Sequence, residues 1–282
     1  MKTDKKKIFF KIIQNKKLFI GGIMIVIIVS LISLAPHIAP YDYKTISTGE
    51  RLELPSKEHL FGTDHLGRDI FSRVLYGGRY SFIIAIFVVI GSNCLGTTMG
   101  LISGYLGGKY DLLIMRIADI VFTLPYIIIA ALVTLIAKRS MFTVILALSI
   151  IYFPSFARIS RGSTLSVKET NYVKSGVISG ETTPTILIKY ILPNISGPII
   201  VQSAMTLAYA VLIEAILSYL GYGLAPPIPS WGLILQDATK YYIVNPYIVI
   251  FPGLAIVITV LSFSFFGDGL RDFLDPKFVP IL

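Results

Sequence analysis

Long apolar stretches alternate with shorter polar ones along most of this chain. A helix that crosses a bilayer needs about 20 mostly apolar residues. Stretches that meet this requirement lie at 18–36, 81–103, 112–137, 141–157, 196–220 and 246–267. The pattern therefore predicts an all-α membrane protein with six transmembrane helices.

The polar segment 158–195 interrupts this pattern between the fourth and fifth spans. Its predicted helix starts are Ser166 with Glu169, and Thr183 with Pro184, and its predicted stops are Gly180 and Pro193. The first start has the spacing of a capping box, and the second has proline pre-set for the first helical position. Glycine can adopt the left-handed conformation that ends a helix. Two short helices around a glycine hinge form a stiff, exposed element suited to transmitting force to a partner.

Composition supports a membrane location. The 282 residues are 54% hydrophobic and 15% charged, which is too apolar for an ordinary soluble domain. The lysines before the first span are Lys2, Lys5, Lys6, Lys7, Lys11, Lys16 and Lys17. By the positive-inside rule they predict a cytoplasmic N-terminus, and six spans then also place the C-terminus and 158–195 in the cytoplasm. This topology accounts for most of the net charge of +9 without a nucleic-acid partner.

The first apolar run is long and lacks a small-x-small cleavage pattern, so we expect it to remain as an anchor. The expected divisions are a cytoplasmic 1–17, a first helix 18–36, an extracytoplasmic 37–80, a core 81–270 and a cytoplasmic 271–282. Cys94, the sole cysteine, lies inside the second span, which excludes an intramolecular disulfide.

Small residues recur every fourth position at the end of the second span, at Gly96, Gly100, Gly104 and Gly108. Such a strip lets helix backbones approach closely in lipid. Packing within the chain is the favoured interpretation, and a subunit interface is the alternative.

Ionisable residues inside apolar spans are costly and are functional candidates. Asp119 follows Arg116 by three residues, so an ion pair within one helix is expected. Glu214 has no local partner in the sequence. Lining of a transport pathway and hydrogen bonding between helices both remain open for it.

The sequence lacks the motifs expected for ATP binding, for a zinc site and for nucleophilic catalysis. The stretch GGKY at 107–110 lacks the spacing of a P-loop, so ATP binding by that route is excluded. His37, His59 and His65 do not form a zinc-ligand pattern. No pairing of a nucleophile with a base stands out. We therefore expect no catalytic residue, no metal site and no cofactor.

Two dense strings fall outside the predicted spans. HLFGTDHLGRDIFSRVLYGGRYS at 59–81 combines alternating charges with turn glycines and predicts an ordered loop with a short helix. YGLAPPIPSWGLILQDA at 222–238 is rich in proline and carries Trp231, the sole tryptophan, which suits an interfacial depth.

These strings, with FPGLAIVITVLSFSFFGDGLRDFLDP near the C-terminus, resemble the permease subunits of dipeptide, oligopeptide and nickel ABC importers, and most of all the shorter "C" type. The resemblance extends from about residue 18 to residue 276. It implies a type I importer fold, with one N-terminal helix before a five-helix core. The implied partners are a second permease, two ATPase subunits and an extracytoplasmic binding protein, in the plasma membrane of a prokaryote.

The resemblance also implies that 158–195 is the loop that couples the permease to an ATPase. The positions that align with the coupling pattern of this family are Lys174, Ser175, Gly176, Gly180, Tyr190, Leu192 and Pro193. Lys174 replaces the acidic residue of the general pattern, and Ser175 and Gly176 replace its alanines.

Peptides are the expected substrate, with nickel or a metal chelate as the alternative. Two alternatives of other classes are a secondary transporter, which would need an ion-coupling site, and a membrane scaffold, which would leave the structured 158–195 segment unexplained.

Overall fold

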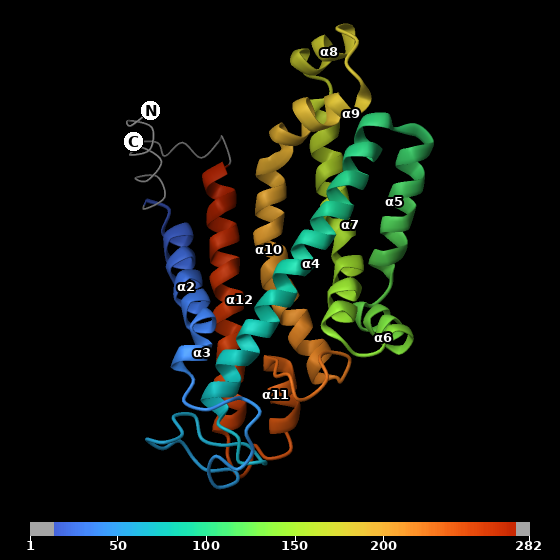
Figure 1. The fold of residues 1–282 in the computed structure, drawn as a ribbon. Helices are drawn as coiled ribbons and strands as arrows, with labels where there is room; N and C mark the ends of the chain where they lie inside the picture. Colours follow the sequence, from blue (N-terminus) through green and yellow to red (C-terminus); the bar gives the residue numbers. More distant parts are fainter. Residues whose placement is uncertain (1–13, 275–282) are drawn as a thin grey trace.

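The computed structural model describes residues 14–274, and long helices run side by side along one axis of the molecule (Figure 1). The longest are α2 (Lys16–Ser33), α4 (Ile70–Leu106), α7 (Met141–Val167), α10 (Leu192–Tyr219) and α12 (Tyr247–Leu274). The shorter elements are α3 (Ala35–Ile38), α5 (Gly108–Thr123), α6 (Tyr126–Ala137), α8 (Asn171–Ile178), α9 (Thr183–Thr185), the π-helical turn η1 (Ile186–Ile191) and α11 (Trp231–Ala238). The all-α prediction is confirmed.

Five helices are long and apolar enough to cross a membrane, and α5 with α6 makes a sixth span if the pair is counted together. The predicted continuous helix over 112–137 is therefore wrong. The chain bends by 95° between α5 and α6, at Leu124 and Pro125. Proline lacks an amide hydrogen and disfavours the helical conformation of the residue before it, and Leu124 is extended.

The other long helices of the core are also longer than predicted: α10 begins at Leu192 rather than at 196, α12 continues past 267 to Leu274, and α4 and α7 differ most. The helix α4 begins at Ile70 rather than at residue 81, because the Asp69 carboxylate accepts a hydrogen bond from the Ser72 amide at 2.7 Å and caps the helix there. The short helix expected within 59–81 is thus the start of α4. The helix α7 continues ten residues past its predicted end at 157, to Val167.

The glycine strip joins α4 to α7. A Cβ atom built on Gly96, Gly100 or Gly104 would lie within 3.0 Å of atoms of α7, backbone oxygens among them. Packing within the chain, the favoured interpretation of the strip, is confirmed at these three positions. Gly108 is an exception, because α4 ends before it and Gly108 begins α5 with φ +53° and no atom near its Cβ position.

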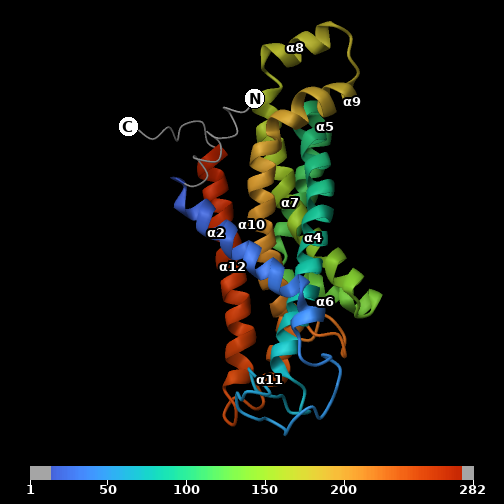
Figure 2. The ribbon, with the colours of Figure 1, turned by 60° about the vertical axis from the view of Figure 1, so that its left-hand side comes forward.

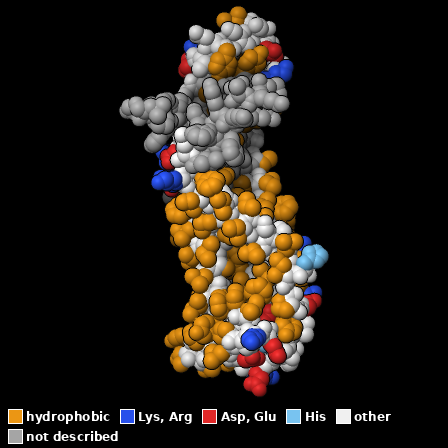
Figure 3. Space-filling view, turned by 90° about the vertical axis from the view of Figure 1, so that its left-hand side faces the viewer, with side chains coloured by type: hydrophobic (Ala, Val, Ile, Leu, Met, Phe, Trp, Pro, Cys, Tyr) orange, Lys and Arg blue, Asp and Glu red, His pale blue; other side chains and the backbone are white. Residues whose placement is uncertain are grey.

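On another side of the bundle, α2 packs along α12. Gly21 lies against the backbone of Ser262 and Phe266, and Gly269 lies against Leu18. Hydrophobic side chains cover the middle of this face, and charged ones gather toward its ends (Figure 3). That distribution is typical of a surface in contact with lipid.

The helix α11 lies at the end of the bundle opposite to α8 (Figure 1). Trp231 is 2% exposed, and its indole Nε1 donates a hydrogen bond to the Val74 carbonyl of α4 at 2.8 Å. An indole inside a bundle needs such an acceptor. The interfacial depth of Trp231 stays a prediction.

The start of α2 and the end of α12 lie together at the end of the bundle nearer to α8 (Figure 2). Asn15 Nδ2 donates to the Gly269 carbonyl at 2.9 Å, and the Lys17 ammonium lies 3.6 Å from the Asp272 carboxylate. The predictions for Lys2, Lys5, Lys6, Lys7 and Lys11, and for 275–282, concern residues outside the described range.

Candidate functional site

The 158–195 segment forms one end of the molecule, where α8 and α9 lie across the long helices (Figure 2). Its predicted first helix start is wrong. Ser166 lies inside α7 and its hydroxyl donates to the Gly162 carbonyl, whereas α8 begins at Asn171. Packing extends α7 here, because Ser160 and Thr164 are fully buried against α4.

Glu169, expected to cap this helix, instead forms an ion pair with the Lys174 ammonium at 3.0 Å. The hydrogen bond from Lys174 lowers the pKa of Glu169. Both side chains are more than half exposed, so the pair contributes little to stability.

Gly180 ends α8 as predicted. Its φ is +80°, its amide donates to the Val177 carbonyl at 3.0 Å, and the Glu181 amide donates to the Gly176 carbonyl at 3.1 Å. This is the Schellman arrangement, in which a left-handed residue closes the last turn of a helix. The hinge position thus has a fixed backbone geometry.

The second helix begins at Thr183 and Pro184 as predicted, but Pro193 does not end it. The helical path continues through η1 into α10, and the Leu192 amide donates to the carbonyl of Leu187, five residues earlier. This wider turn leaves Pro193 in the first turn of α10, where a missing amide hydrogen is tolerated.

Apolar contacts hold the segment onto the bundle. Val173 of α8, with Ile186 and Ile191 of η1, is buried in one cluster with Leu101 of α4 and Phe156 of α7. Because Val173 is 1% exposed, α8 is anchored along one side.

The structure brings two of the positions that align with the coupling pattern together. Gly176 faces the ring of Tyr190, and a Cβ atom on Gly176 would lie 3.4 Å from it. Lys174, Ser175 and Pro193 are exposed, and Leu192 is half-buried. The segment therefore has an inner, packed side and an outer, open side.

The outer side of α8 is polar at Lys174 and Ser175 and apolar at its C-terminal end. Ile178 is 86% exposed and Val177 is 51% exposed, at the tip of a segment that is fixed on its inner side. Two exposed aliphatic side chains therefore lie next to each other on a helix that is anchored along its opposite side. The sequence-based interpretation identified the segment but not these two residues.

Glu214 of α10 is fully buried. Its carboxylate accepts hydrogen bonds from Ser81 of α4 at 2.7 Å and from Ser218 of its own helix at 2.6 Å. The side chain therefore bonds between helices in this structure.

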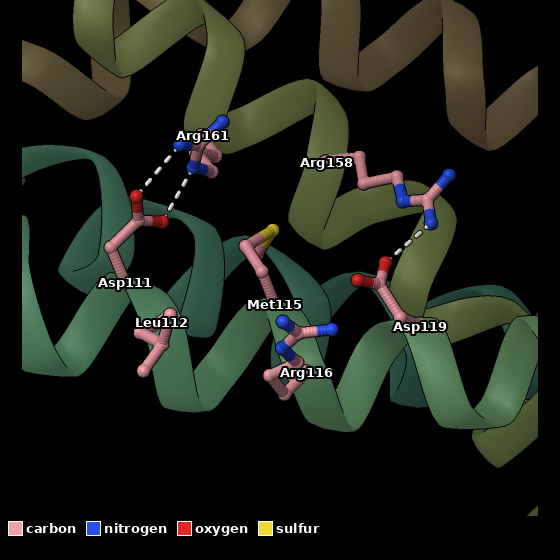
Figure 4. Close-up of a pocket in the computed structure, with 7 residues that line it drawn as sticks. All are labelled: Asp111, Leu112, Met115, Arg116, Asp119, Arg158 and Arg161. Atoms are coloured by element: carbon pink, nitrogen blue, oxygen red, sulfur yellow. Dashed lines mark hydrogen bonds and ion pairs between the residues drawn. The ribbon is translucent and has the colours of Figure 1, made fainter.

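The expected pair of Arg116 with Asp119 is not formed. Asp119 of α5 accepts from Arg158 of α7 at 2.7 Å (Figure 4). The Arg158 guanidinium lies over the Phe122 ring, 4.3 Å from its centroid. The neighbouring helix supplies a cation with an aromatic support, which a partner three residues away on the same helix does not have.

A buried ion cluster at the opposite end was not predicted. Asp64 accepts from Arg68 at 2.6 Å and from Arg73, and both arginines also reach Asp237 of α11, at 3.4 and 3.5 Å. Burial opposes ionisation of Asp64, but the charges of Arg73 and Arg68 hold its pKa below the ordinary value. The cluster joins the 59–81 and 222–238 strings. The i,i+4 spacing of Asp64 and Arg68 was a signal in the sequence, whereas nothing indicated Asp237.

His59, one of the three histidines considered as metal ligands, is 1% exposed and its Nδ1 lies 3.0 Å from the Asp69 carboxylate. It stacks on Tyr41 with ring centroids 5.0 Å apart. The ring therefore packs between the loop and the start of α4.

The chain is similar in sequence to known permease proteins over nearly its whole length. A glutathione transport system permease protein of Pectobacterium atrosepticum is 39% identical over 98% of this chain and 92% of its own. A dipeptide transport system permease protein of Alkalihalophilus pseudofirmus is 40% identical over 95% of this chain and 88% of its own. An oligopeptide transport system permease protein of Bacillus subtilis is 39% identical over 94% and 87%.

The fold also matches a chain of the methionine ABC transporter MetNI in an inward-facing conformation, with a TM-score of 0.60 and 18% identity. That match covers 73% of this chain and 98% of the other, which confirms the importer permease fold. The family model described as "binding-protein-dependent transport system inner membrane component" matches residues 96–280. With the relatives above, this match shows that the chain belongs to the family of binding-protein-dependent transport system inner membrane components.

Proposed function

We propose that this chain is one of two permease subunits of an ATP-driven importer and forms half of a pathway for peptides. Two ATPase subunits bind at the α8 end, and an extracytoplasmic binding protein delivers the peptide at the α11 end. Both chain termini lie in the cytoplasm. This permease contributes no catalytic residue, because hydrolysis takes place in the ATPase subunits.

The observation that carries the proposal is the two-sided construction of the 158–195 segment. Its inner side is packed through Val173, while its outer side exposes Ile178 and Val177. A docking helix can transmit movement to the long helices only if its contacts with them stay intact while it is pushed. The buried base and the fixed turn at Gly180 supply that stiffness.

The names of the relatives support the substrate class. They are permeases for dipeptides, for oligopeptides and for glutathione, which is itself a peptide. We therefore propose peptides rather than nickel or a metal chelate.

In the proposed mechanism, closure of the two ATPases on ATP displaces α8. The movement passes through η1 into α10, which continues from it without a break, and through the end of α7. The shifted helices open the pathway to the outside, and hydrolysis restores the inward-facing state.

The experiment is co-purification of the ATPases with a tagged permease that carries Ile178→Asp. A charge on this apolar surface should oppose docking, and we expect ATPase recovery to fall about tenfold, equivalent to loss of one buried aliphatic contact. The matched control is Ile243→Asp, because Ile243 is 83% exposed in the loop that follows α11. Equal recovery with both variants would contradict ATPase docking on α8.

A further inference from the structure

A polar junction joins α4, α5 and the part of α7 that belongs to the 158–195 segment. Asp111 lies in the first turn of α5. Its carboxylate accepts two hydrogen bonds from Arg161 of α7, from Nε at 2.5 Å and from Nη2 at 2.7 Å (Figure 4). It accepts a third from the Ser103 hydroxyl of α4. A bidentate pair fixes the relative orientation of its two groups as well as their distance.

The two larger helices at this junction are already held together. Gly104 of α4 lies against α7, so closely that a Cβ atom would be 2.9 Å from the Arg161 carbonyl. Next to it, the Lys168 ammonium donates to the Gly104 carbonyl at 3.0 Å. The ends of α4 and α7 therefore form one unit beside α8.

Besides this junction, one small apolar cluster holds α5 to that unit, in which Ala118 packs with Phe153 and Ala157 of α7. Among the residues of α5, all within the described part of the chain, Ala118 alone is buried. Its second ion pair, Asp119 with Arg158, has both side chains about half exposed and one hydrogen bond. Both pairs border a groove of about 620 Å³ that also includes Arg116 (Figure 4).

We propose that Asp111 is a positioning residue that makes α5 move with α7 when α8 is displaced. The inference rests on the proposed function. The helix α6, beyond the break at Leu124 and Pro125, packs on α7 itself through Ala130, so the junction acts on α5 alone. Without the junction, α8 would still dock and move, but α5 would lag behind α7.

The first test measures the junction in the purified permease alone. With Cys94 replaced by serine, spin labels are attached at Leu113 of α5 and Ser166 of α7, both exposed. The intact protein should give one narrow distance distribution, and Asp111→Asn should broaden it. Arg161→Lys, which keeps the cation but not the bidentate geometry, is the second variant in case Asp111→Asn does not fold. An unchanged distribution in the variants would overturn the proposal.

The second test measures coupling in the reconstituted four-component importer. We expect Asp111→Asn to keep ATP hydrolysis that responds to loaded binding protein, while peptide moved per ATP falls about tenfold, as for loss of one charge-assisted hydrogen bond. The matched control, Asp119→Asn, should change this ratio less than about twofold, since its pair is exposed. The exchange Asp111→Arg with Arg161→Asp should restore part of the ratio, because the effect belongs to the pair rather than to either residue alone.

A normal ratio of peptide to ATP in Asp111→Asn would overturn the proposal. If the unaltered complex moves no peptide, the proposed function fails instead. The spin-label distances need neither substrate nor ATPase, so they decide the role of Asp111 in either case.

Discussion

Glu214 illustrates how this chain keeps a carboxyl group inside an apolar bundle. Both of its oxygens accept hydrogen bonds from serine hydroxyls, one on α4 and one on its own helix. A buried polar group without such partners is costly. Ser81 therefore contributes to stability through the group that it satisfies as much as through its own packing.

Replacement of Ser81 by alanine should leave one Glu214 oxygen without this donor and destabilise the protein by about 1–3 kcal/mol. The matched control is Ser92→Ala in the same helix. Ser92 is equally buried, but its hydroxyl donates to the Val88 carbonyl of its own helix at 2.7 Å. Thermal unfolding in detergent should show a clear loss for Ser81→Ala and a small one for Ser92→Ala. Equal losses would contradict this role of Ser81.

The sequence identified Glu214 as costly but not its partners. The expectation of no local partner was wrong, because Ser218 lies four positions on in the same helix and donates to Glu214. Ser81 lies 133 positions away, and its hydroxyl resembles many others in the chain. The same holds for Asp111 and Arg161, which are 50 positions apart. Local spacing suggested Arg116 as the partner of Asp119, and the neighbouring helix supplied Arg158 instead.

Glycine in the sequence predicted the end of a helix more reliably than proline did. Gly180 has the left-handed conformation that the sequence suggested. Pro125 ends a helix, whereas Pro154, Pro198 and Pro252 lie inside α7, α10 and α12. The latter helices are held by many buried side chains, but α5 buries only Ala118. Tertiary support, which the sequence pattern does not express, decides whether a helix continues through proline.

Gly180→Ala should weaken transport because an L-residue at φ +80° costs about 1–2 kcal/mol. The matched control is Gly162→Ala, inside α7 near its C-terminal end. Neither glycine has an atom within 4 Å of its Cβ position, so the two differ in backbone conformation rather than in space. Peptide uptake should fall in Gly180→Ala and persist in Gly162→Ala. Unimpaired uptake in Gly180→Ala, at normal abundance, would refute the hinge assignment.

The two ends of the bundle differ in construction. One end carries the packed 158–195 segment and the described ends of α2 and α12. The other carries the 39–69 loop, closed onto α11 by the cluster of Asp64, Arg68, Arg73 and Asp237. The apolar pattern predicted the number of spans and their approximate positions. It could not predict how the two outer strings pack together, because ion pairs between distant segments leave no period in the sequence.

Thiol labelling tests the orientation of the two ends. In a Cys94→Ser background, a cysteine at Lys57, exposed in the 39–69 loop, should react with an impermeant reagent in intact cells. A cysteine at Lys174, exposed on α8, should react only after the cells are permeabilised. The reverse pattern would show that the termini face outward.

The most direct measurement is peptide accumulation in proteoliposomes of defined composition. The permease alone should neither hydrolyse ATP nor accumulate a dipeptide, and the same should hold after addition of the second permease. Addition of the two ATPases and a loaded binding protein should produce uptake that requires ATP and is lost in Ile178→Asp. Uptake by this chain alone, driven by an ion gradient without ATP, would contradict its role as a coupled permease subunit.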